Sequence, residues 1–210
     1  MKDEILRDLI RGILNESGQI EFDKYPSISN VYAPSDKPAR KLLVISPGRD
    51  NAYEWKGKPA APHHYQNAIT LLNDDIAIVV AKNSGTSIDS VLADIAKNDV
   101  LSKISTIELL GFSSGGNRVL HFMKSSGNAG KFSKFYLADP WWSETAQTAS
   151  VPFASKTILM YRPKNWKNIA EMTAIFNVMR KSVESGGGTV IETDMLHPDI
   201  LRAMISKANS

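Results

Sequence analysis

Short runs of apolar residues, many of them β-branched, recur along most of this 210-residue chain and restrict its fold more than any other feature. Each run has the length of a single strand and is continuously apolar rather than alternately apolar and polar. Continuous apolarity is typical of strands covered on both faces, as in a parallel sheet between layers of helices. We therefore predict strands at residues 41–46, 76–81, 106–111, 134–139, 157–161 and 189–193.

Segments with helical periodicity separate these runs. Apolar residues recur at spacings of three and four over residues 64–73, 87–97, 115–126, 166–184 and 198–208. Strands that alternate with helices are typical of α/β domains. The predicted fold class is therefore α/β, with a mainly parallel central sheet and helices on both faces.

The length of the chain fits a single domain, and no internal repeat or linker divides it. We expect residues 1–18 to form a surface helix, because their apolar side chains recur at helical spacing. Residues 19–40 contain two β-like pieces, "QIEF" and "SNVYA", that could pair as an edge hairpin. Residues 41–208 would form the α/β core, without an insertion long enough for a large cap domain.

The composition argues against several classes of function. Apolar residues make up 42% of the chain and charged residues 22%, as in ordinary globular proteins. The net charge is only +3, and bases are scattered among acids, so we expect no nucleic-acid partner. The absence of cysteine excludes disulfides, thiolate metal sites and a cysteine nucleophile. The histidines and carboxylates match no metal-ligand spacing, so we expect neither metal nor cofactor.

The sequence also bears on membrane association and location. Acids and bases occur throughout the N-terminal segment, unlike in a secretory signal. Nowhere do 18 apolar residues follow one another, so we expect no transmembrane segment. The lack of a signal favours a cytoplasmic location, although a chain without cysteine suits the cytosol and the outside alike. Nothing in the sequence indicates an oligomeric state.

Residues 108–122, "ELLGFSSGGNRVLHF", place serines and glycines between a predicted strand and a predicted helix. Residues 111–115 match G-x-S-x-G, in which a sharp turn lifts the serine hydroxyl above the sheet edge. The flanking glycines fit because side chains there would collide with the neighbouring strand and helix. We predict that Ser113 is a nucleophile. Ser113 or Ser114 could instead cap the helix, or the turn could bind phosphate, although P-loop and dinucleotide patterns are absent.

The stretch "GFSSGG" between strand and helix, in this order of elements, resembles the α/β-hydrolase superfamily over residues 40–205, as a small, capless, esterase- or lipase-like member. In that family the nucleophile, acid and histidine follow one another along the chain, with the histidine after the last strand. His197 in "TVIETDMLHPDIL" stands at that place. The resemblance therefore implies that His197 is the general base, although it could simply cap a helix beside Pro198. The other histidines precede the nucleophile or lie in the helix after it: His63, His64 and His121.

The acid of the triad departs from the family pattern. Its usual place follows the strand at 157–161, where "YRPKNW" contains no Asp or Glu. Asp139 in "LADPWW" is the nearest carboxylate on the correct sheet edge, and some family members similarly carry the acid one strand earlier. The resemblance implies Asp139 as the acid, whereas an Asp-Pro pair could also simply form a turn. Weaker candidates are Asp194, Asp199 and Glu171.

Attack on a carbonyl creates an oxyanion, which needs preorganised backbone N–H donors. The amide of Ser114 is one candidate, because it lies at a helix N-terminus, where the dipole favours negative charge. The resemblance places the second donor after the first parallel strand, in "ISPGRDNAYEW". Many members have His-Gly there, whereas this chain has Pro47-Gly48. The amide of Arg49 is the second candidate, although its side chain could simply pair with Asp50.

Aromatic residues are expected around the mouth of this site. Trp141 and Trp142 follow Asp139, where aromatic walls suit an acyl chain or a ring-bearing substrate. They could equally cover the core. Tyr53 is expected to join the same wall, as are Trp55 and Trp166. A basic cluster of Arg162, Lys164 and Lys167 could favour an anionic substrate, although such clusters are usually solvated loops.

These features together predict a serine hydrolase that cleaves a small, lipid-borne or polymer-borne carboxylic ester through an acyl-serine intermediate. Base rates within the superfamily favour esters. An amidase, peptidase or thioesterase would use the same triad and oxyanion hole. The chain could also be a binding protein on a hydrolase-like fold whose catalysis has lapsed, as the missing acid and missing His-Gly suggest.

Overall fold

The computed structural model describes residues 25–32, 39–48, 75–99, 101–141, 149–163 and 170–209. The strands are β1 (Ile28–Tyr32), β2 (Lys41–Ser46), β3 (Ile76–Ala81), β4 (Thr106–Phe112), β5 (Lys134–Ala138), β6 (Thr157–Tyr161) and β7 (Thr189–Glu192). The helices are α3 (Ile88–Ala96), α4 (Ser114–Ser125), α5 (Ala170–Ser185) and α6 (His197–Asn209), with short 3-10 turns η3 (Leu101–Lys103), η4 (Ala129–Lys131) and η6 (Ala154–Lys156).

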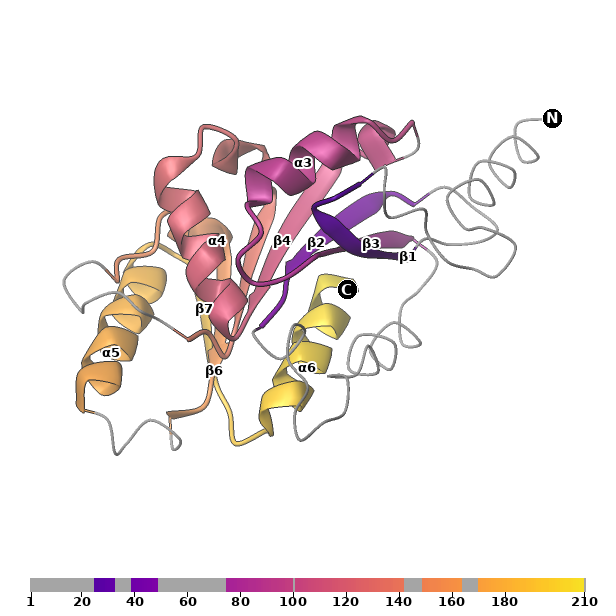
Figure 1. Ribbon diagram of the computed structural model, residues 1–210. Helices are drawn as coiled ribbons and strands as arrows, with labels where there is room; N and C mark the ends of the chain where they lie inside the picture. The colour runs from indigo at the N-terminus through magenta and orange to yellow at the C-terminus, as the bar shows by residue number, and fades with distance from the viewer. Residues whose placement is uncertain are drawn as a thin grey trace.

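The strands form one seven-stranded sheet in the order β1-β3-β2-β4-β5-β6-β7. The edge strand β1 runs antiparallel to β3, and the other neighbouring strands are parallel. Helices α3, α4 and α5 lie on one side of the sheet and α6 on the other (Figure 1). The predicted α/β class, with a mainly parallel sheet and helices on both faces, is therefore confirmed.

Two apolar layers enclose the sheet, and alternate residues of each strand enter opposite layers. In β2, Leu42 and Val44 pack in the layer with α3, α4 and α5, whereas Leu43 and Ile45 pack in the layer with α6. All four side chains are fully buried. Complete burial of such a side chain stabilises a fold by about 1.5–3 kcal/mol. Burial on both faces is why these strands are continuously apolar in the sequence.

Several expected elements lie wholly or partly outside the described residues. These are the helix at residues 1–18, the "QIEF" piece, the helix at 64–73 and the start of the helix at 166–184. The second β-like piece contributes to β1, which pairs with β3 and contains an irregularity in register between Ile28 and Asn30. The parallel strands fix the site, because they all point their carboxyl ends at the same edge of the sheet.

Candidate active site

Ser113 forms the turn between the end of β4 and the start of α4, with φ 53° and ψ −124°. Residues other than glycine rarely adopt such a conformation, and it persists only where the surroundings enforce it. Its N–H donates to the carbonyl of Ala138 at 3.0 Å, and its own carbonyl accepts from Gly116 at 2.9 Å and Trp141 at 2.8 Å. Ser113 occupies the N-cap position, but its hydroxyl makes no capping hydrogen bond. A capping role therefore does not account for this serine.

The glycines around Ser113 allow three backbone segments to approach closely. A Cβ added at Gly111 would lie 2.7 Å from the Cα of Gly116, and one added at Gly115 would overlap the carbonyl oxygen of Ser46. A Cβ at Gly48, after β2, would lie 2.9 Å from the Cβ of Ser113. The end of β4, the start of α4 and the end of β2 can therefore lie this close together only without side chains at these positions. The backbone after β2 lies directly against Ser113.

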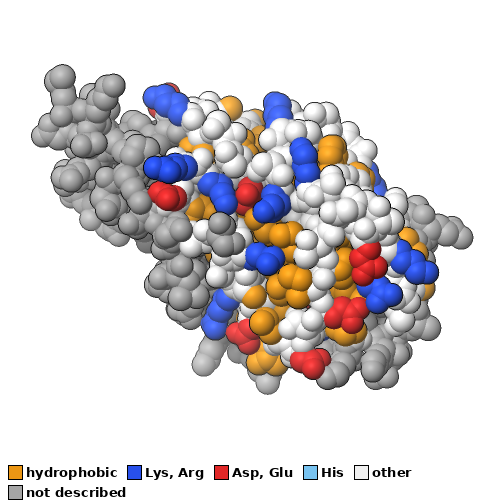
Figure 2. All heavy atoms as spheres, turned by 180° about the vertical axis from the view of Figure 1, so that it is seen from behind, with side chains coloured by type: hydrophobic (Ala, Val, Ile, Leu, Met, Phe, Trp, Pro, Cys, Tyr) orange, Lys and Arg blue, Asp and Glu red, His pale blue; other side chains and the backbone are white. Residues whose placement is uncertain are grey.

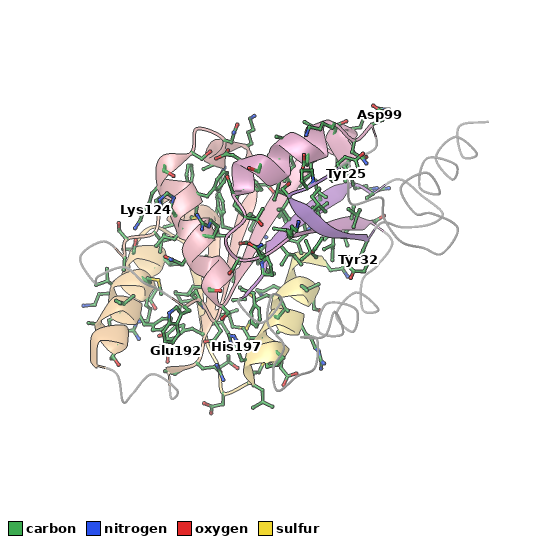
Figure 3. The ribbon with its side chains drawn as sticks, in the orientation of Figure 1. Tyr25, Tyr32, Asp99, Lys124, Glu192 and His197 are labelled. Carbon is green, nitrogen blue, oxygen red and sulfur yellow. The ribbon has the colours of Figure 1, made fainter. Side chains whose placement is uncertain are left out.

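Asp139 and His197 meet at the same edge of the sheet. Asp139 directly follows β5 with φ 42°, and its side chain is fully buried. His197 is the first residue of α6 (Figure 3), and its Nδ1 lies 2.6 Å from Asp139 Oδ2. The imidazole also stacks on the ring of Phe112, with 4.4 Å between ring centroids. Phe112 immediately precedes Ser113, so the structure gathers the serine turn, the imidazole and the carboxylate in one place.

Arg162, which directly follows β6, also contacts Asp139. Its Nε and Nη2 each lie 2.6 Å from Asp139 Oδ2, and its backbone N–H donates to Oδ1 at 3.3 Å. The sequence predicts Arg162 only as part of a basic cluster at the mouth of the site and does not predict this contact. The contact arises because β5 and β6 are parallel neighbours, so the residues that directly follow them lie at the same edge of the sheet.

The surroundings of Asp139 favour its ionised form. Burial by itself raises the pKa of the carboxyl group. The hydrogen bond and charge of His197, and then the charge and hydrogen bonds of Arg162, outweigh this effect and lower the pKa below its ordinary value. An ionised carboxylate is the form that can accept a hydrogen bond from His197 and fix the orientation of its ring.

The structure describes only some of the other predicted site residues. The amide of Ser114 opens α4, and among the described residues it has no acceptor, as expected for a first-turn amide. Trp141 is 43% exposed, so a large part of this residue lies at the surface. Asp199 pairs with Arg202 at 3.3 Å, and His121 lies exposed on α4. Predicted residues outside the described ranges, or with side chains outside them, are Arg49, Tyr53, Trp55, His63, His64, Trp142, Trp166 and Glu171.

On the face seen in Figure 2, basic and acidic side chains of the described residues are interspersed. Within the described ranges, no three histidine or carboxylate side chains gather closely enough to hold a metal ion. None of the described helices has the length and apolarity needed to cross a membrane.

No family model matches the sequence, and a search of curated proteins finds no match. Solved structures share the fold. A lipase/esterase from Lactobacillus plantarum is 12% identical with a TM-score of 0.52, over 85% of this chain and 91% of that one. A soluble variant of monoglyceride lipase from Saccharomyces cerevisiae, in complex with a substrate analog, is 9% identical with a TM-score of 0.50, over 86% and 91%. The chain thus has the α/β-hydrolase fold, which confirms the resemblance at the level of fold.

Proposed function

We propose that this protein is a serine hydrolase that cleaves a carboxylic ester through an acyl-Ser113 intermediate. The observation that carries the proposal is the 2.6 Å contact between His197 Nδ1 and Asp139 Oδ2, beside the strained turn at Ser113. Nucleophile, acid and histidine follow in the order Ser113, Asp139, His197, which is the order of α/β-hydrolase triads. The fold shared with a lipase/esterase and a monoglyceride lipase supports the same class of reaction.

The chemistry begins with a neutral imidazole. Asp139 Oδ2 accepts from Nδ1–H, so the tautomer with a bare Nε2 is favoured. As Ser113 Oγ attacks the ester carbonyl carbon, Nε2 takes the hydroxyl proton, and the imidazolium is stabilised by Asp139. Collapse of the tetrahedral intermediate breaks the bond to the alcohol oxygen, which receives the proton from Nε2. Water then attacks the acyl-serine with the same proton transfers and releases the acid.

The oxyanion formed in both steps is stabilised by backbone amides. We assign one donor to Ser114, whose N–H opens α4 and benefits from the helix dipole. We assign the other to Arg49, on the basis that Gly48 lies against Ser113 and the next amide follows at once. Loss of a single donor of this kind typically lowers kcat by about 10²–10³-fold.

We prefer an ester over an amide or thioester because the structures that share the fold are a lipase/esterase and a monoglyceride lipase. The exposed residue Trp141 would contact the acyl or alcohol part of the ester. The alternative of a lapsed binding protein rests on two departures from the family pattern, the missing acid at the usual position and the missing His-Gly after the first parallel strand. The contact of Asp139 with His197 supplies a carboxylate from another strand and weakens that argument.

A fluorophosphonate probe tests the proposal, because it phosphonylates only an activated serine. Wild type should be labelled at Ser113, and Ser113→Ala should not. Ser90→Ala, which removes an exposed hydroxyl on α3, is the matched control and should be labelled like wild type. A panel of chromogenic esters and anilides then separates ester from amide hydrolysis. An unlabelled wild type, or equal labelling of Ser113→Ala, would contradict the assignment of Ser113.

A further inference from the structure

The carboxylate of Asp139 is shared between two partners. Its Oδ2 contacts Nδ1 of His197 and both Nε and Nη2 of Arg162, each at 2.6 Å. The Asp139 side chain is fully buried, and that of Arg162 is only 17% exposed. Charge pairs with so little water around them interact more strongly than surface pairs. The hydrogen bond that orients His197 therefore forms on an oxygen that a guanidinium already holds.

The strand register explains why Arg162 reaches this oxygen. β5 and β6 pair in parallel with Ala138 opposite Met160, and the N–H of Asp139 donates to the carbonyl of Met160 at 2.7 Å. The chain leaving β6 therefore passes directly beside Asp139. In the superfamily resembled by the sequence, the acid usually follows this strand, whereas here a cation does.

This arrangement has two consequences for His197. The guanidinium, with its planar fork of donors, stops the carboxylate from rotating. Its positive charge also competes for the carboxylate, so the imidazolium is stabilised less than it would be by Asp139 alone. The first effect favours a productive ring orientation, and the second weakens the support that Asp139 gives to the imidazolium.

Other charged groups near His197 are engaged elsewhere. On α6, Asp199 pairs with Arg202 at 3.3 Å, and from β7, Glu192 contacts the Tyr161 hydroxyl at 2.6 Å and Arg180 at 3.2 Å. Asp194 lies in the loop before α6 and has its own interaction. From β4, the ring that packs on His197 is the uncharged Phe112. Among the described residues, Arg162 is thus the cation in contact with the His197–Asp139 pair.

We propose that Arg162 is a positioning residue that holds Asp139 for His197 and sets how strongly Asp139 stabilises the imidazolium. This inference rests on the proposed function. The variants Arg162→Met and Arg162→Lys separate the two effects, because lysine keeps the charge but not the planar fork. The measurement is kcat/KM against pH on a chromogenic ester.

For Arg162→Met we expect the acid limb of kcat/KM to move to higher pH, because Asp139 without its guanidinium partner would stabilise the imidazolium more strongly. Arg162→Lys should keep the limb near its wild-type position while kcat falls. Arg180→Met, which removes a surface arginine, is the matched control and should leave the limb unchanged. An unmoved limb in Arg162→Met, with or without a uniform loss of activity, overturns the inference.

Failure of the inference about Arg162 can be distinguished from failure of the proposed function. If the wild type itself is not labelled at Ser113 by fluorophosphonate, the function fails and the pH experiment has no substrate reaction to follow. Should Arg162→Met not fold, Arg162→Lys decides: a limb that stays in place with a reduced kcat supports the inference, and a variant indistinguishable from wild type in kcat overturns it.

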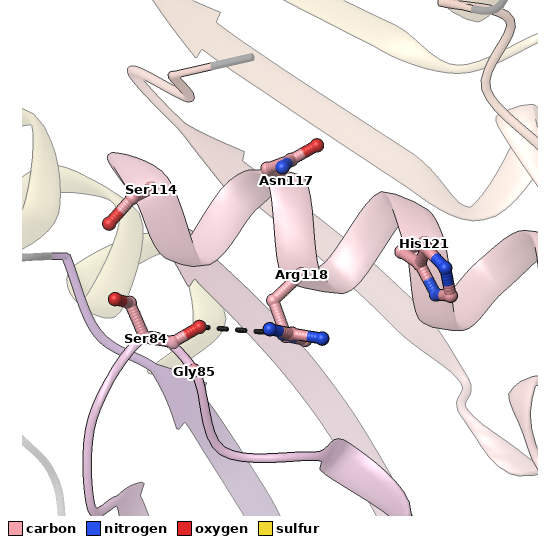
Figure 4. Close-up of a pocket in the computed structure, with 6 residues that line it drawn as sticks. All are labelled: Ser84, Gly85, Ser114, Asn117, Arg118 and His121. Carbon is pink, nitrogen blue, oxygen red and sulfur yellow. Dashed lines mark hydrogen bonds between the residues drawn. The ribbon is translucent and has the colours of Figure 1, made fainter. Parts of the chain in front are cut away.

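A crevice of about 230 Å³ lies between the loop after β3 and the first turns of α4 (Figure 4). The lining residues are Ser84, Gly85, Ser114, Asn117, Arg118 and His121. Four of them recur along α4 at spacings of three and four, so they form one polar face of the helix. The crevice begins at Ser114, the residue after the proposed nucleophile.

The described residues of the lining are rich in donors and include no carboxylate. Arg118 Nε donates to the Ser84 carbonyl at 3.4 Å, and among the described residues its Nη atoms have no acceptor. The hydroxyl of Ser114 is buried and, within the same residues, has no hydrogen-bond partner. A guanidinium with hydroxyl donors is well suited to a carboxylate or phosphate group. Arg118 lies four residues along the helix from Ser114, or about 6 Å.

We infer that this crevice binds an anionic group, carboxylate or phosphate, carried by the ester substrate. The inference rests on the proposed function and predicts that Arg118 makes the protein prefer esters that carry an anionic group over uncharged esters. The probes are p-nitrophenyl butyrate and the mono-p-nitrophenyl ester of succinic acid, whose acyl chain ends in a carboxylate. Inorganic phosphate and succinate, as inhibitors, distinguish the two anions.

Arg118→Gln should lower kcat/KM for the succinate ester about tenfold more than kcat/KM for the butyrate ester, the usual weight of one charge-assisted hydrogen bond. Lys124→Gln, which makes the same charge change near the other end of α4, is the matched control and should affect neither ester. An equal loss on both esters, or no loss on either, overturns the inference. Hydrolysis of butyrate by every variant except Ser113→Ala would show that the proposed function stands independently.

Discussion

Gly115→Ala perturbs the closest approach between the serine turn and the sheet. In an ordinary helix this change stabilises by about 1 kcal/mol, because alanine is a better helix former. Here the added Cβ would overlap the carbonyl oxygen of Ser46 and lie 2.6 Å from that of Pro47. Both obstacles are backbone atoms, in the last residue of β2 and in the residue after it, so no side-chain rotation relieves the clash.

The helix must therefore move away from β2. Overpacking of this kind typically costs about 1–3 kcal/mol, which exceeds the gain in helix propensity. In a chain of this size each kcal/mol lowers Tm by about 2–4 °C. The movement also displaces Ser113 and the amide of Ser114, and a misplacement of about 1 Å can cost 10²-fold in rate. We expect Gly115→Ala to lose more in kcat/KM than in stability.

Thermal unfolding and ester hydrolysis measure the two effects, with Gly127→Ala as the matched control. A Cβ at Gly127 would meet nothing within 4 Å, so this variant should be unchanged or stabilised by about 0.4–1 kcal/mol. A Gly115→Ala protein as stable and as active as Gly127→Ala would refute the close-approach argument.

Three further outcomes follow from the described contacts. Asp139→Asn should lower kcat about 10³–10⁴-fold, because an amide can stabilise the wrong tautomer of His197; single-turnover labelling with fluorophosphonate would check this. Because the pKa of Asp139 is lowered in the fold, its ionisation stabilises the protein above the unfolded pKa, and this contribution is lost as pH falls through the folded value. Urea unfolding between pH 2 and 6 should show the loss in wild type and a weaker pH dependence in Asp139→Asn. Tyr136→Phe removes the hydroxyl that donates to buried Glu108 at 2.9 Å and should cost about 1–3 kcal/mol in urea unfolding, since it leaves the carboxylate short of a partner.

The sequence predicted the sheet well because strands buried on both faces must be continuously apolar, as in "IAIVVA" of β3. The turn at Ser113 was also predictable, because glycine at 111 permits the close approach of α4 to β4 and glycine at 115 permits its approach to the end of β2. The contact of Arg162 with Asp139 was not, since it depends on the register between β5 and β6 rather than on either sequence. The stacking of Phe112 on His197 likewise depends on where α6 begins.

The positions of the proposed nucleophile and the proposed acid are linked by the backbone. Ser113 and Asp139 follow adjacent parallel strands, and both have positive φ, at 53° and 42°. The N–H of Ser113 donates to the carbonyl just before Asp139, and the carbonyl of Ser113 accepts from Trp141, just beyond it. Each strained turn is therefore held in part by the other, which is the condition under which unusual backbone conformations persist. In this chain the proposed acid follows β5, beside the turn of the proposed nucleophile, and the position after β6 holds Arg162, which contacts that acid.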